Sequence, residues 1–236
     1  LVGWHQQEHD PAADEHALEQ LAVWCHRFSP SAGVEDAAGQ TPPWAETLLL
    51  DATNLAPLYG SEEQLVHQVA AGFAHLQLHA RFALADTIGA AWAVSHYGHA
   101  GQAVEELPPV VPPATTREAL KALPIEALRL PDDVVHTLHR LGIFAIDDLL
   151  GLPRDQLCSR FGPLLLTRID QALGRNVEAF VAVDPPPDFC VSQDLEHPLA
   201  QREAVEHVAG QLIERVAHLL AAHNAGALQL RCRFDC

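Results

Sequence analysis

Two proline-rich stretches most constrain how this chain of 236 residues can fold. The first reads ELPPVVPPATT at residues 106–116, and the second reads VDPPPDF at residues 183–189. Proline fixes one backbone angle and has no amide hydrogen, so neither stretch can continue a helix or the middle of a sheet. The chain is therefore expected to form three units, one before the first stretch, one between the two and one after the second.

The first unit, residues 1–105, contains two well-marked helix starts. Asp10 followed by Pro11 is typical of a helix N-terminus, because the carboxylate can accept an orphan amide and proline needs no partner at the first turn. Ser61 opens the capping-box sequence SEEQ. Apolar residues at three- and four-residue spacing continue both segments, which predicts two amphipathic helices.

Strands and helices alternate in this unit. The leucine-rich segment 46–53 and the segment ARFALAD at 80–86 predict strands, and the small-residue segment 87–98 predicts a helix. The order strand, helix, strand, helix is typical of a sheet with helices on one side. Such a sheet is expected to have a further strand, which we place before Leu1.

The second unit, residues 118–180, predicts short helices that turn at Leu-Gly and Phe-Gly-Pro. The third, residues 189–236, predicts a strand at its start, a long amphipathic helix over about residues 199–222, and an alternating strand, ALQLRCRFD, at its end. Residues 106–117 and 181–188 are the expected linkers.

The charge distribution limits the classes of partner. A net charge of −17 argues against a general binder of polyanions. Residues 1–100 carry two basic and twelve acidic side chains, whereas residues 150–176 carry four arginines and two aspartates. Any contact with nucleic acid is therefore expected in the second of these windows.

Other classes of site lack their sequence signals. The five cysteines include no Cys-x-x-Cys pair, so neither a disulfide framework nor a zinc ribbon is expected. The fifteen histidines form pairs without a third ligand at a suitable spacing. No apolar run approaches 18 residues, and no signal sequence is seen, so we expect a cytoplasmic protein without a membrane contact.

The order of several stretches is similar to one family. WCHRFSPSAGVED, LLLDATN, ARFALADTIGAAWAVSHYG and LGIFAIDDLLGLPRDQLCSRFGPLLLTRIDQALGR together resemble the Y-family translesion DNA polymerases. The resemblance covers nearly the whole chain and is closest to the ImuB-type subgroup, the non-catalytic subunit of the bacterial mutasome. It implies a multi-domain α+β fold with a partial ferredoxin-like palm (1–105), a small thumb of helix-hairpin-helix type (118–180) and a truncated β-α-β little finger (189–236).

The strand that holds metals in active relatives is altered here. Active Y-family palms carry Ser-x-Asp-Glu-Ala-x-Leu-Asp, and the Asp-Glu pair with a further Asp binds two Mg²⁺ ions. Alignment on Leu50 and Asp51 places Glu46 at the metal-binding Asp and Thr47 at the Glu. Two divalent cations need about three carboxylates, and threonine supplies none. The resemblance thus implies a degenerate site without metal or cofactor, in which Glu46 is either a partial ligand or a solvated acid.

The positions that hold the nucleotide are altered as well. Active relatives carry Asn-Lys-x-x-Ala-Lys at the next strand-to-helix turn, where the lysines bind phosphates. Here Ile88 and Trp92 occupy the two lysine positions. A triphosphate carries about four negative charges, so the loss of both cations removes most of its binding site.

Two turns of the second unit correspond to hairpins that grip DNA in the family. The first, RLPDD at 129–133, has Pro131 and two aspartates in place of Gly-Ile-Gly and a basic residue, so it should not bind a phosphate. The second, SRFGPLLLTR, keeps its glycine between arginines, so weak and salt-dependent contact with primer-template DNA is expected there. Otherwise the arginines are helix-surface charges paired with Asp155 and Asp170. The candidate nucleic-acid contacts are Arg160, Gly162, Arg168 and Arg175.

The resemblance implies a scaffold for error-prone translesion synthesis in an SOS-type response to DNA damage, located at the bacterial nucleoid. Its implied partners are an error-prone replicative-type DNA polymerase, a RecA-like accessory subunit and the sliding clamp. One alternative is an active Y-family polymerase with altered acidic residues, which would need Mg²⁺. A second alternative is a protein–protein interaction module that does not bind DNA.

Overall fold

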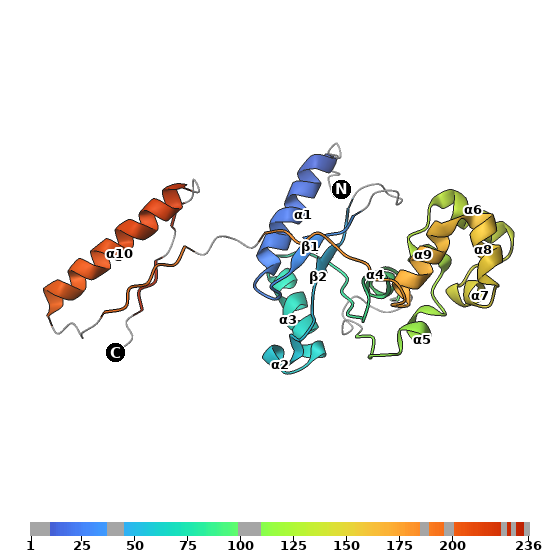
Figure 1. Cartoon of the computed structure of the whole chain (residues 1–236), viewed down its shortest axis with the longest axis horizontal. Coiled ribbons are helices and arrows are strands. Elements are labelled where there is room, and N and C mark those ends of the chain that lie inside the picture. The colour runs from blue at the N-terminus through green and yellow to red at the C-terminus, as the bar shows by residue number, and fades with distance from the viewer. Residues whose placement is uncertain are drawn as a thin grey trace, which may run out of the picture. The chain divides into compact units, whose positions relative to one another are not determined.

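A computed structural model describes residues 10–36, 45–98, 110–184, 189–195, 201–222, 226–227 and 230–233 of the chain. The chain divides into two compact units, Leu1–Pro185 and Pro186–Cys236. The first unit contains helices as well as a small sheet (Figure 1), which agrees in outline with the expected α+β class. The assignment of parts to palm, thumb and little finger stays a prediction.

The N-terminal half of the first unit alternates helices with short strands. Its elements are α1 (Pro11–Cys25), β1 (Ala32–Val34), β2 (Leu48–Leu50), α2 (Ala56–Tyr59), α3 (Glu62–His75) and α4 (Ile88–Tyr97).

Side-chain caps fix where three of these helices begin. Asp10 accepts a 3.1 Å hydrogen bond from the amide of Ala13, and Ser61 accepts one of 3.2 Å from the amide of Gln64. Thr87 caps α4 in the same way, through the amide of Ala90 at 3.0 Å. Each cap satisfies one of the amides that a helix N-terminus leaves without a partner. The three helices predicted from the sequence in this region are therefore confirmed.

The sheet is smaller than predicted. β1 and β2 pair antiparallel with Gly33 opposite Leu49, but only Leu48–Leu50 of the predicted strand 46–53 belongs to the sheet. The strand predicted over 80–86 is wrong, since Leu84 makes only an isolated parallel bridge to Val110. A strand needs a hydrogen-bonded neighbour along its length, and this segment pairs at one residue among those described.

After α9 the chain returns to the sheet in an extended segment, residues 176–183, which we call the strap. Ala182 of the strap forms an antiparallel bridge with Gly33, and the amide of Val183 donates a 2.8 Å hydrogen bond to the carbonyl of Ala32. A side chain at Gly33 would place its Cβ 2.3 Å from the carbonyl oxygen of Val181. Glycine therefore allows the strap to approach β1.

The C-terminal half of the first unit is helical, as the sequence predicts. Its elements are α5 (Thr116–Leu120), the 3₁₀ helix η1 (Ile125–Leu128), α6 (Asp132–Arg140), α7 (Ile146–Leu150), α8 (Arg154–Phe161) and α9 (Pro163–Ala172).

Two apolar clusters stabilise the unit. The first lies between α1, α3 and the sheet, and includes Cys25, Leu65 and Phe73. Burial raises the pKa of the Cys25 thiol to about 11, so this cysteine stays neutral and packs as an apolar residue. The second cluster lies within the C-terminal helices and also contains Ala90 and Ala93 of α4. Helix α4 follows the sheet region in the sequence, but its buried residues Ala90 and Ala93 pack into the core of the C-terminal helices.

The second unit contains α10 (Arg202–Ala222), which confirms the long helix predicted near 199–222. Residues 189–195 and 230–233 form no strand, so the two flanking strands are absent from the residues described there. None of the helices in the described ranges is both long and apolar enough to cross a membrane.

Candidate functional site

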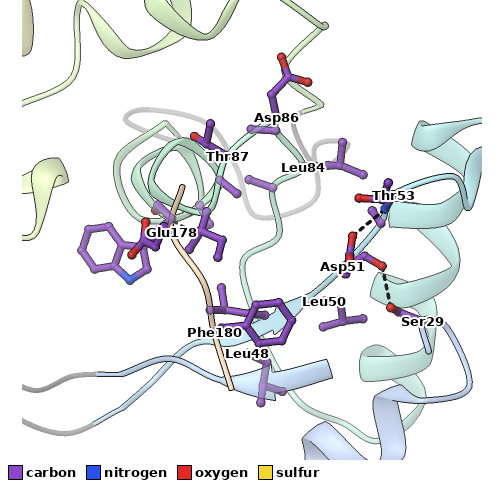
Figure 2. A pocket seen from close by; sticks show the side chains of 18 of the residues that line it. Ser29, Leu48, Leu50, Asp51, Thr53, Leu84, Asp86, Thr87, Glu178 and Phe180 are labelled. Atoms are coloured by element: carbon purple, nitrogen blue, oxygen red, sulfur yellow. Dashed lines mark hydrogen bonds between the residues drawn. The ribbon is translucent and has the colours of Figure 1, made fainter. Parts of the chain in front are cut away.

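The first unit contains a cleft of about 760 Å³. It lies between β2, α3, the segment 81–88 and the strap, and we call it the central cleft. Figure 2 shows Leu50 and Asp51 on one side of it, Leu84 and Asp86 on another, and Glu178 and Phe180 of the strap on a third. The segments that resemble the polymerase nucleotide site thus contribute to one cavity.

The two residues at the metal-binding positions point to different places. Thr47 lines the central cleft, and its buried hydroxyl has no hydrogen-bond partner among the described residues. The carboxylate of Glu46 is half exposed outside the cleft, 3.9 Å from Nε2 of His96. The amide of Glu46 donates a 3.1 Å hydrogen bond to Glu35. Because neighbouring residues of an extended chain face opposite ways, these two side chains cannot share a ligand.

Asp51 lies at the end of β2 beside the cleft. Its carboxylate accepts a 2.9 Å hydrogen bond from the amide of Thr53, seen in Figure 2. Hydrogen bonds from the Thr53 hydroxyl and amide hold the pKa of Asp51 below its usual value. Its main-chain carbonyl accepts a hydrogen bond from Ser29 at 2.6 Å. The Asp51 carboxylate thus forms the turn that ends the strand.

The donor set around the cleft does not fit a pair of magnesium ions. The carboxylate of Asp51 already accepts a hydrogen bond from the amide of Thr53, and that of Asp86 accepts a 3.1 Å hydrogen bond from the amide of Ala114. Within the described parts of the chain, no group of three or more His, Cys, Asp or Glu side chains is placed to hold a metal ion.

Trp92, at one of the two lysine positions, is part of a polar and aromatic network. Its indole Nε1 donates a 2.9 Å hydrogen bond to Oε2 of Glu35, and its ring stacks on His96 with centroids 3.8 Å apart. Nδ1 of His96 lies 2.8 Å from the carbonyl oxygen of Trp92. Ile88, at the other position, lines the central cleft. The sequence did not indicate a role for Glu35. The one feature that could have drawn attention to it is its place directly after the small apolar residues Ala-Gly-Val.

Arg168 does not lie at the surface with the other candidate DNA contacts. Its side chain is only 16% exposed, and its guanidinium lies 3.4 Å from Glu178 of the strap. Arg129 is still more buried and pairs with the same carboxylate at 2.7 Å. Burial, and next the neighbouring charge of Arg129, lowers the pKa of Arg168. The structure therefore places Arg168 in an internal ion-pair cluster, formed by Arg129, Arg168 and Glu178.

Two of the other candidate DNA contacts, Arg160 and Gly162, lie at the turn between α8 and α9, and the third, Arg175, follows the C-terminal end of α9. Arg175 pairs with Asp170 at 3.5 Å, and Arg154 pairs with it at 2.6 Å, as the alternative reading predicted for this aspartate. The exposed Arg160 lies over the ring of Phe161, with 5.9 Å from its guanidinium carbon to the ring centroid. Gly162 adopts a positive φ of 81°, and a Cβ there would meet no atom within 4 Å. The turn between α8 and α9 is therefore open, whereas Arg154 and Arg175, at the other ends of these two helices, are partly neutralised by Asp170.

The first hairpin position has a different structure from a phosphate-binding turn. Asp132 and Asp133 occupy the first turn of α6, where carboxylates interact favourably with the positive end of the helix. Pro131 is the N-cap residue, so it contributes no amide donor there.

The chain is similar to curated proteins named ImuB from two strains of Caulobacter vibrioides. With each it shares 35% identity over 227 residues, which is 96% of this chain and 46% of the relative. The chain thus spans about half the length of the curated relatives it matches. No protein-family model and no solved structure matches it. Over almost its whole length the chain is similar to ImuB, which confirms the resemblance to ImuB-type proteins predicted from the sequence.

Proposed function

We propose that this chain is part of a non-catalytic Y-family polymerase homologue that acts as a scaffold in error-prone synthesis across damaged DNA. The similarity to ImuB over 96% of the chain supports the family and the process. The observation that supports the loss of catalysis is the network of Trp92. Trp92 occupies a position at which active relatives carry a phosphate-binding lysine. Its side chain is instead hydrogen-bonded to Glu35 and stacked on His96.

The charge of the central cleft supports the same proposal. Among the described residues that line it, four are carboxylates, Asp51, Glu62, Asp86 and Glu178, and one is a cation, Arg81. Nη1 of Arg81 donates a 3.1 Å hydrogen bond to the carbonyl oxygen of His96. Glu178 is neutralised by Arg129 and Arg168, but the other three carboxylates still outnumber Arg81, so such a lining would repel a nucleotide triphosphate with about four negative charges.

The partners follow from the scaffold role. We propose an error-prone replicative-type polymerase, a RecA-like accessory subunit and the sliding clamp as protein partners in the bacterial cytoplasm. The acidic residues 1–100 suit protein partners better than DNA. Primer-template DNA would bind weakly at the turn between α8 and α9, through Arg160 and Gly162, with Arg175 beyond the C-terminal end of α9 as a further contact.

Primer extension with the full-length protein tests the absence of catalysis. We expect no nucleotide incorporation with Mg²⁺ or Mn²⁺, beside an active Y-family polymerase as positive control. Incorporation that disappears in Glu46→Gln but persists in the exposed control Glu19→Gln would establish the active-polymerase alternative instead.

Complementation of a strain that lacks the gene tests the scaffold role. Wild-type protein and Glu46→Gln are both expected to restore damage-induced mutagenesis to the same level, because no step uses that carboxylate. Loss of mutagenesis in Glu46→Gln, with normal protein abundance, would contradict a non-catalytic role.

Fluorescence anisotropy with a primer-template tests DNA binding by the full-length protein. We expect weak binding that decreases with salt, and a further decrease in Arg160→Ala, because fewer counterions are released. Arg202→Ala, an exposed arginine on α10, is the matched control and should bind as wild type does. Absence of binding at low salt would favour an interaction module without DNA.

A further inference from the structure

One carboxylate of the strap is shared by two buried arginines. Nη1 and Nη2 of Arg129, which follows η1, lie 2.7 Å from Oε1 and Oε2 of Glu178. Nη1 of Arg168, on α9, lies 3.4 Å from Oε1 of the same carboxylate. Figure 2 shows Glu178 on the strap, beside the central cleft. Two guanidinium groups thus converge on one oxyanion, and a phosphate group is bound by guanidinium groups in the same planar, two-point manner.

The two arginines have more donors than Glu178 can accept. Each guanidinium has five N–H groups, whereas the carboxylate has two oxygens. Nε of Arg129 and Nε of Arg168 are both buried and have no hydrogen-bond partner among the described residues, and the Arg129 side chain is only 5% exposed. The exposed carboxylate of Asp36 also acts electrostatically on Arg168. A buried donor without an acceptor is costly, so this pair suits a larger set of acceptor oxygens than the strap supplies.

Groups other than Glu178 also hold the arginines in place. The guanidinium carbon of Arg129 lies 5.7 Å from the ring centroid of Trp92, which is the distance of a cation–π contact. Arg129 adopts a left-handed backbone with φ 54°, a conformation that is unfavourable for a residue with a Cβ. Nη1 of Arg168 donates a 3.3 Å hydrogen bond to Oε1 of Gln171. The pair should therefore keep its arrangement when Glu178 moves away.

The part of the strap that carries Glu178 is attached mainly at its two ends. The amide of Asn176 donates to a carbonyl of α9, and the amide of Val183 donates to β1. Between them, residues 177–180 make no backbone hydrogen bond to another described residue. The side chains of Val177 and Val181 are 89% and 86% exposed, so they contribute little to packing. This part of the strap can therefore shift without loss of either end attachment.

We propose that Arg129 and Arg168 form a binding site for phosphate groups of the DNA backbone, which Glu178 covers in this conformation. Glu178 occupies the place of a phosphate, and a shift of residues 177–181 uncovers both guanidinium groups. Exchange of one oxyanion for another leaves both arginines paired, so it avoids the penalty of an unpaired buried charge. The inference rests on the proposed contact with DNA, to which it adds a second contact that the strap regulates.

Phosphate rescue of full-length Glu178→Gln tests the site. This variant leaves both arginines without their carboxylate, so inorganic phosphate should bind and stabilise the folded state. In urea, the folded-to-unfolded ratio should rise about tenfold once the phosphate concentration is about ten times its dissociation constant. NaCl at equal ionic strength is the control for screening, and Gly89→Ala, which is weakened at another place, is the control for general stabilisation by phosphate. Equal gains in Glu178→Gln and Gly89→Ala would overturn the inference.

Fluorescence anisotropy with primer-template DNA tests whether the phosphate is that of DNA. Glu178→Gln should bind more tightly than wild type, and log affinity should fall more steeply with log salt, by a slope of about 1 to 2, because one or two further phosphates are contacted. The gain should persist when Arg160→Ala is added, so failure of the proposed contact at the turn between α8 and α9 is distinguishable from failure of this inference. Unchanged DNA affinity beside phosphate rescue would overturn DNA as the ligand.

A shorter acid provides a second variant in case Glu178→Gln does not fold. Glu178→Asp keeps the charge of the strap but lacks one methylene, so its carboxylate should reach the two arginines less well. Smaller gains of the same kind, in phosphate rescue and in DNA affinity, are expected. Their absence in a folded Glu178→Asp protein would overturn the inference.

Discussion

The indole Nε1 of Trp92 donates a 2.9 Å hydrogen bond to the carboxylate of Glu35, a residue 57 positions earlier and 7% exposed. The other carboxylate oxygen of Glu35 accepts the amide of Glu46. One side chain thus joins α4 to the segment before β2.

Replacement of Glu35 by Ala should lower the free energy of unfolding by about 2 kcal/mol, because two donors in a protected site lose their acceptor. Urea unfolding followed by tryptophan fluorescence measures this, since all four tryptophans belong to the first unit. Glu19→Ala on α1, with a half-exposed side chain, should change the value by no more than about 0.5 kcal/mol. Equal values for the two variants would refute a structural role for the network.

Glu178 should be among the most sensitive positions of the chain. Glu178→Gln leaves Arg129 and Arg168 buried without their shared carboxylate, and breaking a buried ion pair costs about 3 kcal/mol or more. The exposed Glu118→Gln is the control, since its pair with Lys121 is at the surface. A loss below about 1 kcal/mol in Glu178→Gln would show that the cluster of Arg129, Arg168 and Glu178 contributes little.

Asp170 should make stability depend on pH in the acid range. Its hydrogen bond from Arg154, together with the charges of Arg154 and Arg175, holds the pKa of Asp170 below its usual value. The stabilisation is therefore complete above the unfolded pKa near 3.9 and is lost as pH falls through the lower folded pKa. Asp170→Asn should cost about 0.5–1 kcal/mol at pH 7, since Arg154 is half exposed, and the difference should shrink in acid. A constant difference from pH 7 to pH 3, or the same loss in Asp155→Asn, would contradict this.

Gly89 should not tolerate a methyl group. A Cβ at this position would lie 2.9 Å from the Cα of Ala172, so α4 would have to move away from α9. We expect Gly89→Ala to cost about 1–3 kcal/mol, although alanine favours a helix. Gly151→Ala is the control, because its nearest contact is 3.8 Å away. Thermal unfolding of both variants decides the point, and unchanged stability of Gly89→Ala would refute the close packing of the two helices.

Local signals in the sequence predicted the helices well. Asp10, Ser61 and Thr87 each precede a helical apolar pattern, and each caps its helix by accepting a hydrogen bond from the amide three residues later. A helix cap depends only on residues that are close in the sequence, so it can be recognised without knowing the tertiary structure. The strands depend on distant neighbours, which explains why the segment 80–86 was wrongly predicted and why Ala32–Val34 was missed.

The candidate site was predicted in its components but not in its contacts. Thr47 and Asp51, which flank β2, line the same cleft as Ile88 of α4, although the two segments are distant in the sequence. The side-chain pairs of Glu35 with Trp92 and of Arg129 with Glu178 join residues 57 and 49 positions apart. No spacing rule links side chains that are so far apart in the sequence. The sequence therefore does not distinguish a buried, ion-paired arginine such as Arg168 from an exposed one.

The bridge between the strap and β1 also constrains when the fold can be completed. Ring nitrogen Nε2 of His26 lies 3.1 Å from the carbonyl of Val183, across 157 positions of sequence. A ribosome that adds about 5–20 residues per second needs roughly 8–30 s to synthesise that interval. During that time the outer edge of β1 has no strap, and the nascent chain depends on its helices, whose contacts are local and form first. The earliest residues of the sheet are thus among the last to reach their final pairing.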